Sequence, residues 1–480
     1  MRRDLSIPQG IARPERKAAR SLLSLLAILA ALLLQPGHRA MASMADDALV
    51  QTESGFVRGT VGPDYRLFLG IPYAAPPIGN LRWRPPQPAP GWGAARDATV
   101  PAAPCPQSDP RTGALIGSED CLYLDITTPY GGHADRPLPV MVWVHGGGFV
   151  SGSSAAYDGR NLATKGNVVV VTLNYRLGML GFLAHLALDT ESPDGLSGNF
   201  GLADQQAALR WIQRNIAAFG GDPLNITIFG DEAGANSICA QLVSPGAAGL
   251  FERAIVQNGN CVDLLPVVDA AEKRGDALAQ DLGCDDPKAA PDCLRGKSIS
   301  DLLKVDSAQR KASDPLVWGP VVGAAGLPLQ PADGLANGTL PKISLMVGAA
   351  GGASACATLA METLAGRKTT LYGYDFADTG SDLPYLFATE LDRASNPDNL
   401  PPIHQALADQ MIGYWSEFAH KGDPNGPGLP AWPQFHTASD VMALAPVPEG
   451  SHPIAFDRKH HCGGGRRAPM PPPSISTQSP

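Results

Sequence analysis

The sequence predicts an α/β fold with a mostly parallel central sheet and helices on both faces. Short apolar runs rich in β-branched residues recur between helical stretches, which is typical of buried parallel strands. These runs are Val140–Val144, Val168–Leu173, Ile226–Phe229, Ala254–Gln257, Ile343–Val347 and Thr370–Tyr374. Residues Gly201–Phe219 place apolar side chains at helical intervals and end at Gly220-Gly221, which predicts a helix with a glycine cap.

The chain divides into three parts. Residues 1–42 hold a basic start, the 13-residue apolar run Leu22–Leu34 and small residues at Ala40 and Ala42, the pattern of a signal peptide cleaved after Ala42. An uncleaved anchor is less favoured, since a membrane span needs about 20 apolar residues. Residues 43–462 form one domain, and residues 463–480 are low in complexity and expected to be disordered. We therefore expect a secreted or periplasmic protein.

The charge of the mature chain restricts its partners. Residues 1–42 hold seven Lys/Arg and two Asp/Glu of the totals 37 and 46, which leaves 30 and 44 and a formal charge of −14. This balance argues against nucleic acids and anionic membranes as partners.

All eight cysteines follow residue 42, and export favours disulfides. Spacing suggests the local pairs Cys105/Cys121 and Cys284/Cys293, and leaves the pairing of Cys239, Cys261, Cys356 and Cys462 open. No cysteine spacing resembles a zinc site, so we expect no metal and no cofactor.

A strand–turn–helix motif carries the main chemical signal. Residues 225–229 read as a strand, Gly230-Asp231-Glu232-Ala233-Gly234 as a tight turn, and a helix follows. In the G-x-S-x-G nucleophile elbow, glycines flank a serine because the turn leaves no room for side chains. Both glycines are present here, but the nucleophile position holds Glu232.

A glycine run follows a predicted strand upstream of the elbow. Val144-His145-Gly146-Gly147-Gly148-Phe149 can expose backbone N–H groups toward a developing oxyanion. Its place about 85 residues before an elbow makes the signal far more specific than a glycine run alone.

With these motifs the chain resembles the type-B carboxylesterase family, which includes cholinesterases and bacterial aryl esterases. Further matching stretches run in family order from residue 68 to residue 426. They are Phe68–Ala74, Ser118–Leu124, Asn174–Gly178, Gly198–Gln205, Phe219–Pro223 and Gly422–Gly426.

The resemblance implies several site features. The fold would be the α/β-hydrolase fold, and Gly147, Gly148 and Ala233 would be the oxyanion-hole donors. Cys105–Cys121 and Cys284–Cys293 would be the family's two disulfide loops, and Arg176 with Asp204 a structural ion pair. A small-molecule ester or a hydrophobic compound would be the ligand.

The family's triad positions hold other residue types here. Serine maps to Glu232. The acid maps to Ala353 in Gly348–Ser354, and the base to Thr379, just before Ser381–Phe387. Only 26 residues separate Ala353 from Thr379, where family members carry a longer insertion, so the pocket wall is expected to differ. Glu362 or Asp375 could occupy space near the acid position.

These substitutions predict a protein without serine-esterase catalysis. Glutamate has no hydroxyl proton for a base to remove, and only residual acceleration survives loss of a whole triad. We expect either that the Glu232 carboxylate binds the N–H groups of Gly147, Gly148 and Ala233, or that it points into a solvated cleft. Neuroligins and the thyroglobulin C-terminal domain are precedents for a non-hydrolytic member.

Two enzymatic alternatives stay open. In one, Ser237, Ser151 or Ser381 replaces the missing nucleophile. In the other, Glu232 is itself the nucleophile, as aspartate is in haloalkane dehalogenases and epoxide hydrolases, which still use a histidine. None of the mature chain's histidines lies in the base motif, and the resemblance gives His145 a structural role.

Overall fold

The computed structural model describes residues 47–109, 111–130, 136–192, 194–312, 318–337, 342–350, 356, 359, 369–377, 381–389 and 402–462. The predicted signal peptide, the predicted tail, Ala353, Glu362 and Thr379 lie outside these residues. Backbone contacts divide the chain into Met1–Leu49, of which only residues 47–49 are described, and Val50–Pro480.

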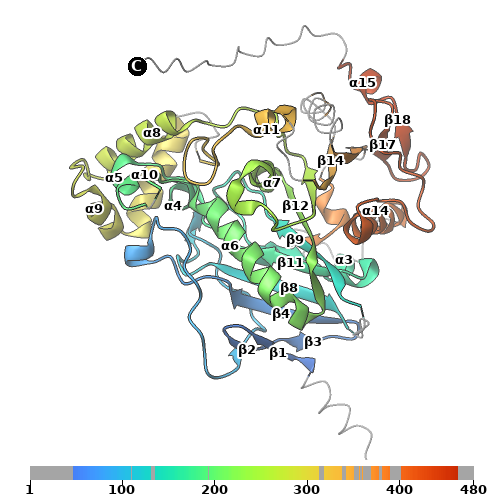
Figure 1. The fold of residues 1–480 in the computed structure, drawn as a ribbon, viewed down its shortest axis with the longest axis horizontal. Coiled ribbons are helices and arrows are strands. Elements are labelled where there is room, and N and C mark those ends of the chain that lie inside the picture. Colours follow the sequence, from blue (N-terminus) through green and yellow to red (C-terminus); the bar gives the residue numbers. More distant parts are fainter. Residues whose placement is uncertain are drawn as a thin grey trace, which may run out of the picture. The chain divides into compact units, whose positions relative to one another are not determined.

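An eleven-stranded sheet crosses the larger unit (Figure 1). From edge to edge its strands are β18 (His452–Ile454), β17 (Val441–Leu444), β15 (Thr370–Phe376), β14 (Ser344–Ala350), β13 (Arg253–Gln257), β12 (Gly221–Asp231), β9 (Leu138–Val144), β11 (Val169–Leu173), β8 (Tyr123–Pro129), β4 (Tyr65–Pro72) and β3 (Thr60–Val61). All pairs from β17 to β11 are parallel, and the pairs at the two ends are antiparallel. The predicted mostly parallel sheet is confirmed.

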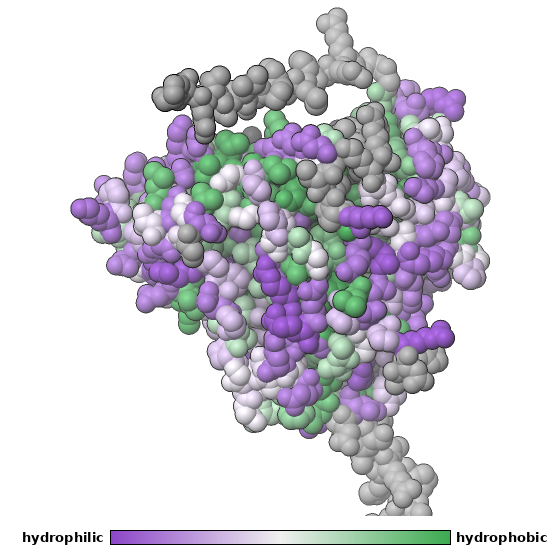
Figure 2. Space-filling view, viewed as in Figure 1, coloured by the Kyte–Doolittle hydropathy of each residue, from purple (hydrophilic) through white to green (hydrophobic). Residues whose placement is uncertain are grey.

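Helices cover both faces of this sheet, as predicted (Figure 1). On one face lie α6 (Phe200–Asn215) and α7 (Ala233–Val243), and on the other α3 (Arg160–Gly166) and α14 (Pro402–Lys421). The predicted helix at 201–219 is α6 continued by the 3-10 helix Ile216–Phe219, and it ends at Gly220 with φ 91°. Hydrophilic side chains cover the solvent-facing side of α6, where Arg210 and Arg214 are exposed (Figure 2).

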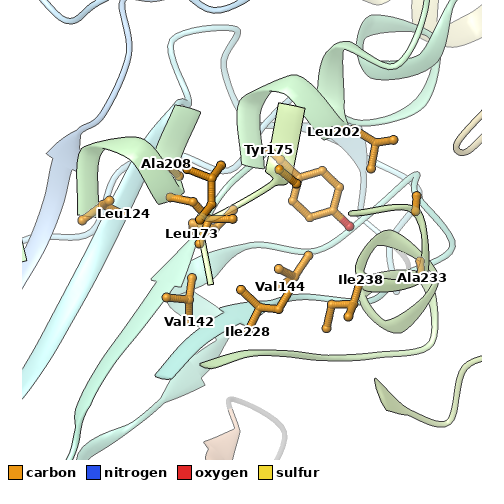
Figure 3. Packing of buried hydrophobic residues seen from close by; sticks show 14 of the residues in the cluster. Leu124, Val142, Val144, Leu173, Tyr175, Leu202, Ala208, Ile228, Ala233 and Ile238 are labelled. Carbon is orange, nitrogen blue, oxygen red and sulfur yellow. The ribbon is translucent and has the colours of Figure 1, made fainter. Parts of the chain in front are cut away.

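The alternation of side chains along the strands explains why two helical layers are needed. Val142, Val144 and Ile228 pack with Ile238 of α7 in one core (Figure 3). Met141, Trp143 and Phe229 point to the opposite face and pack in a second core with α3 and α14. Because successive strand residues alternate between faces, a sheet that is apolar on both faces must be covered on both.

Shorter elements surround the sheet. Among the described residues, the remaining α-helices are α4 (Gly178–Phe182), α5 (Leu186–Asp189), α8 (Val268–Asp281), α9 (Ala290–Gly296), α10 (Ile299–Ala312), α11 (Pro331–Asn337) and α15 (Phe456–Lys459). The small sheets are β1 (Leu49–Thr52) with β2 (Gly55–Arg58) and β5 (Arg96–Asp97), β6 (Gln107–Ser108) with β7 (Leu115–Ile116), and β10 (Tyr157–Asp158) with β16 (Ala388–Thr389). Among the described residues, no helix is both long and apolar enough for a membrane span.

Four disulfides join the eight cysteines. Cys105–Cys121 and Cys284–Cys293 confirm the two pairs suggested by spacing and by the resemblance. Cys239–Cys261 and Cys356–Cys462 are the pairs that the sequence left open. The first of these ties α7, the helix after the elbow, to the loop after β13.

Candidate functional site

Glu232 lies between the end of β12 and the start of α7, where a nucleophile elbow places its nucleophile. Its backbone has φ 48° and ψ −112°, a conformation that non-glycine residues rarely adopt. The Glu232 N–H donates to the Gln257 carbonyl at 3.1 Å, and the Glu232 carbonyl accepts from the Asn236 N–H at 2.9 Å. The turn thus keeps the elbow geometry although its serine is absent.

The two elbow glycines are required by a close approach of β9. A β-carbon on Gly230 would lie 2.6 Å from the Val144 carbonyl oxygen, and one on Gly234 only 2.0 Å from it. A β-carbon on Gly230 would also lie 2.8 Å from the Gly234 carbonyl carbon, where the helix begins. These contacts explain why both glycines remain in a chain that has no serine between them.

The Glu232 side chain is exposed and lies beside Gly146. A β-carbon built on Gly146 would be 3.5 Å from Glu232 Oε2. Within the described part of the chain, no backbone N–H of Gly147, Gly148 or Ala233 donates to the carboxylate. The expectation that Glu232 fills the oxyanion hole is therefore wrong here. The physical reason is hydration: an exposed carboxylate keeps its water, and the alternative of a solvated side chain fits.

The glycine run after β9 has backbone angles that suit glycine, as expected for a loop that presents its N–H groups to a ligand. Gly147 and Gly148 have φ 96° and 61°, and a β-carbon on Gly147 would lie 2.3 Å from the Ser151 carbonyl oxygen. The Gln107 side chain fixes the loop's far end, since its Oε1 accepts from the Gly152 N–H and its Nε2 donates to the Gly152 carbonyl, both at 2.9 Å. The disulfide Cys105–Cys121 encloses Gln107, so the disulfide loop also positions the glycine loop.

His145 is a buried, neutral residue. Its ring stacks on Tyr175 with centroids 4.5 Å apart, and its Nδ1 lies 2.9 Å from the Gly146 carbonyl oxygen. Burial lowers the pKa of His145 to about 4, and its Nε2 has no hydrogen-bond partner among the described residues. A histidine in this environment supports the loop and accepts no proton near neutral pH.

The three alternative serines show no base beside them in the described part of the chain. Ser237 is buried on α7, where its Oγ accepts from Gln205 Nε2 at 3.0 Å. Ser151 Oγ donates to the Gly147 carbonyl at 3.2 Å, and Ser381 Oγ accepts from the Leu383 N–H at 3.2 Å. These contacts are typical of structural serines.

Behind the elbow lies a pair of buried carboxyl groups that sequence reasoning missed. Asn258 Nδ2 donates to Asp231 Oδ1 at 2.6 Å and to Asp382 Oδ1 at 3.0 Å, so one amide joins the two carboxyls. Asp382 Oδ2 also accepts from the Tyr374 hydroxyl at 2.9 Å and from Gln257 Nε2 at 3.0 Å. Their places in the sequence could have indicated the pair, because Asp231 directly precedes Glu232 and Asp382 lies three residues after the predicted base position.

Burial raises the pKa of both carboxyl groups, and the charge of Asp382 adds to the shift of Asp231. Burial, followed by the nearby Asp382 charge, raises the pKa of Asp231 to about 7. Burial also raises the pKa of Asp382, against the effect of its three hydrogen-bond donors. Two carboxyls this close cannot both ionise freely in a dry environment.

Asp375, one of the two residues suggested to occupy space near the predicted acid position, bonds elsewhere. It is buried at the end of β15, where its Oδ2 accepts from Lys459 Nζ at 2.8 Å and lies 3.1 Å from His460 Nε2. These contacts attach α15 to the sheet, so Asp375 is not engaged with the elbow. The Arg176–Asp204 pair predicted from the resemblance is present, buried, with two charge-assisted bonds of 2.7 Å.

No three His, Cys, Asp or Glu side chains are grouped as a metal site among the described residues. A cavity of about 350 Å³ lies elsewhere, with Trp83, Arg84, Glu191, Asn199, Phe200 and Gln206 among its lining residues, and none of the elbow residues lines it. The positions of Ala353 and Thr379 lie outside the described residues, so their assignments remain predictions.

Comparison with known proteins places these motifs in a family. The model of the carboxylesterase family matches residues 46–370 and 372–451. The chain is 42% identical over 323 residues to fumonisin B1 esterase of Sphingopyxis macrogoltabida, covering 64% of this chain but only 57% of that protein. It is 33% identical over 479 residues to cocaine esterase of Homo sapiens, covering 78% and 83%.

Solved structures agree with this assignment. The carboxylesterase of Geobacillus stearothermophilus superposes with a TM-score of 0.74 and 30% identity, over 86% of this chain and 99% of that one. A thermophilic PNB esterase gives the same TM-score and identity over 87% and 99%. The sheet is therefore that of the α/β-hydrolase fold, and the chain belongs to the carboxylesterase family.

Proposed function

We propose that this protein binds a small ligand at the altered elbow and does not hydrolyse esters through a serine nucleophile. The observation that carries the proposal is Glu232 in the nucleophile position, on a turn that keeps its backbone and both glycines. The relatives are named as esterases, so the scaffold is that of a carboxylic ester hydrolase. The proposed loss of turnover concerns this chain's own residues.

The chemistry of the triad supports the proposed loss of serine-esterase turnover. A serine esterase needs a neutral hydroxyl, a histidine that takes its proton and an acid that orients the histidine. Glu232 has no such proton, and no imidazole of the described residues bonds to its carboxylate. With alanine and threonine at the predicted acid and base positions, restoring serine alone should not rebuild the triad.

The proposed ligand is a small carbonyl compound, an ester or another hydrophobic molecule. Gly147, Gly148 and Ala233 are the proposed donors to its oxygen, because the loop and the elbow are held together as in a preformed oxyanion hole. The apolar cores on both sides of the sheet keep these segments rigid.

Glu232→Ser tests the proposal. We expect neither the native chain nor this variant to hydrolyse an aryl acetate above the rate of Gly234→Ala, a control whose elbow is distorted. Turnover by Glu232→Ser at the rate of a working esterase would show that a functional base is in place and would refute the proposed loss of the triad.

One second candidate has a specific observation behind it. The Glu232 carboxylate is exposed and accepts no hydrogen bond from the described residues. It could attack an ester carbonyl, expel the alcohol and form an acyl-enzyme anhydride that water then hydrolyses. Multiple turnovers in ¹⁸O-water, followed by mass analysis of the peptide with Glu232, distinguish the candidates. Incorporation of ¹⁸O into Glu232, with no turnover in Glu232→Gln, would support the nucleophile and contradict ligand binding alone.

We also propose that the chain is exported and cleaved after Ala42. Four disulfides support this, since such bonds persist mainly in oxidising compartments. N-terminal sequencing of the protein recovered outside the cytoplasm should give Ser43 as the first residue and Met44 as the second. A recovered chain that begins at Met1 would contradict this proposal.

A further inference from the structure

The cavity of about 350 Å³ has the lining of a small-molecule site. Leu188, Phe200 and Leu202 give it an apolar wall, and these side chains are themselves buried. Arginine, glutamate, asparagine and glutamine residues are also part of the lining. Apolar walls with a few placed polar groups are typical of ligand pockets, which usually measure about 300–1,000 Å³.

Hydrogen bonds between the lining segments fix the shape of this cavity. Gln206 Nε2 on α6 donates to Ser244 Oγ at 3.0 Å, and Ser244 Oγ donates to the Gly326 carbonyl at 2.6 Å. Asn199 Nδ2, just before α6, donates to the Ala325 carbonyl at 3.1 Å. Four of these five residues line the cavity, so the bonds join its walls to one another. A ligand therefore meets a preformed site and loses little affinity to ordering it.

Arg84 brings a cationic side chain with unused donors to the cavity. Its backbone carbonyl accepts from Arg176 Nη1 at 2.9 Å, which anchors the residue to the buried core. Its side chain is 40% exposed, and its Nη2 lies 3.1 Å from Glu191 Oε2. The guanidinium has no other polar contact among the described residues, so most of its N–H groups can bind a ligand.

Glu191 does not depend on Arg84, because Arg295 already pairs with both of its oxygens. Arg295 Nη1 donates to Oε1 at 2.9 Å and Nη2 donates to Oε2 at 2.6 Å. Two arginines thus face one glutamate, which leaves one positive charge beside the cavity. Asp194 also lines the cavity, but it is exposed, so water and salt screen its charge.

We propose that this cavity is a binding site for a small apolar carboxylate, whose carboxyl group pairs with Arg84. A guanidinium can donate two parallel hydrogen bonds to one carboxylate, which fixes the orientation of the ligand. The apolar body of the ligand lies against Leu188, Phe200 and Leu202. None of the elbow residues lines this cavity, so the site is separate from the one proposed at Glu232 and does not depend on it.

Calorimetric titration with 4-phenylbutyrate and 4-phenylbutyramide tests the proposal, because these compounds share a shape and differ in charge. Arg84→Gln should weaken the binding of 4-phenylbutyrate about tenfold, the loss of one charge-assisted contact, and leave that of the amide unchanged. Arg136→Gln, an exposed arginine outside the lining, is the matched control and should change neither. An unchanged affinity for 4-phenylbutyrate in Arg84→Gln would overturn the proposal.

Two further variants test the charge and the location of the site. Asp194→Asn removes a repulsive charge and should strengthen the binding of 4-phenylbutyrate about twofold without affecting the amide. Ala203→Phe places a ring in the cavity, since Ala203 lines it, and should weaken the binding of both compounds. Full binding of both by folded Ala203→Phe would place them elsewhere and overturn the proposal. Absence of binding by the native protein at millimolar concentrations would overturn it as well.

Discussion

At the scale of single residues, Glu232 occupies a backbone conformation that suits glycine better than glutamate. Residues held at such angles cost about 1–3 kcal/mol each, and the surrounding structure must maintain them. Here the close packing against the Val144 carbonyl and the bonds to the Gln257 carbonyl and the Asn236 N–H hold the turn. The side chain is exposed, so its identity matters little for folding.

Replacing Glu232 by glycine should therefore stabilise the protein. Glycine adopts positive φ without strain, and we expect Glu232→Gly to raise the free energy of unfolding by about 1 kcal/mol. Urea denaturation measures this, with Glu232→Gln as the control that keeps the strain. A loss of stability in Glu232→Gly would contradict the strained turn.

Gly234→Ala should have the opposite effect. Its new β-carbon would lie 2.0 Å from the Val144 carbonyl oxygen, so β9 or α7 must move. We expect a loss of about 2–4 kcal/mol in urea denaturation, the range of severe packing changes. Gly249→Ala, where no atom lies near the β-carbon, is a control for positive φ without a clash. Equal losses in the two variants would contradict the steric explanation.

At the scale of elements, Cys239–Cys261 fastens α7 to the loop after β13. The same loop carries Asn258, so the disulfide also holds the amide that joins Asp231 to Asp382. Replacing both cysteines by serine should cost about 2–4 kcal/mol, because the unfolded chain regains the entropy of an open loop.

Thermal unfolding of Cys239→Ser/Cys261→Ser checks this, beside Cys284→Ser/Cys293→Ser. The second pair closes a shorter loop, with a sequence separation of 9 against 22, so its removal should cost less. A larger loss for the shorter loop would contradict the entropic explanation.

The sequence predicted the regular elements well because apolar β-branched runs and helical spacing are local signals. Val169–Leu173 and Arg253–Gln257 differ from the predicted strands by one residue. It could not predict the Asp231–Asn258–Asp382 contact, because the three residues come from separate segments that only the folded sheet brings together. The sequence also could not predict where the Glu232 carboxylate points, because water and the oxyanion-hole N–H groups compete to bind the same carboxylate.

At the scale of the whole molecule, Asp231 should make stability depend on pH. Its folded pKa of about 7 lies above its ordinary value of 3.8, so the folded state binds the proton more tightly than the unfolded state. Stability from this group is fully present below about pH 3.8 and is lost as pH rises toward 7. Asp231→Asn should remove this loss.

Urea denaturation at pH 5 and pH 8 tests the dependence. Relative to the native protein, Asp231→Asn should gain a few kcal/mol more at pH 8 than at pH 5. His145 acts in the opposite direction, because its lowered pKa makes the folded state less stable in acid. Comparing Asp231→Asn with the native chain at the same pH cancels this contribution. An equal difference at both pH values would contradict a protonated Asp231.

The proposed absence of a serine nucleophile from this carboxylesterase scaffold is tested most directly by intact-mass analysis after treatment with a fluorophosphonate. We predict no adduct on the native protein and no hydrolysis of an aryl acetate above the background of the unfolded chain. A stoichiometric adduct on any serine, accompanied by loss of aryl-acetate hydrolysis, would contradict the proposed function.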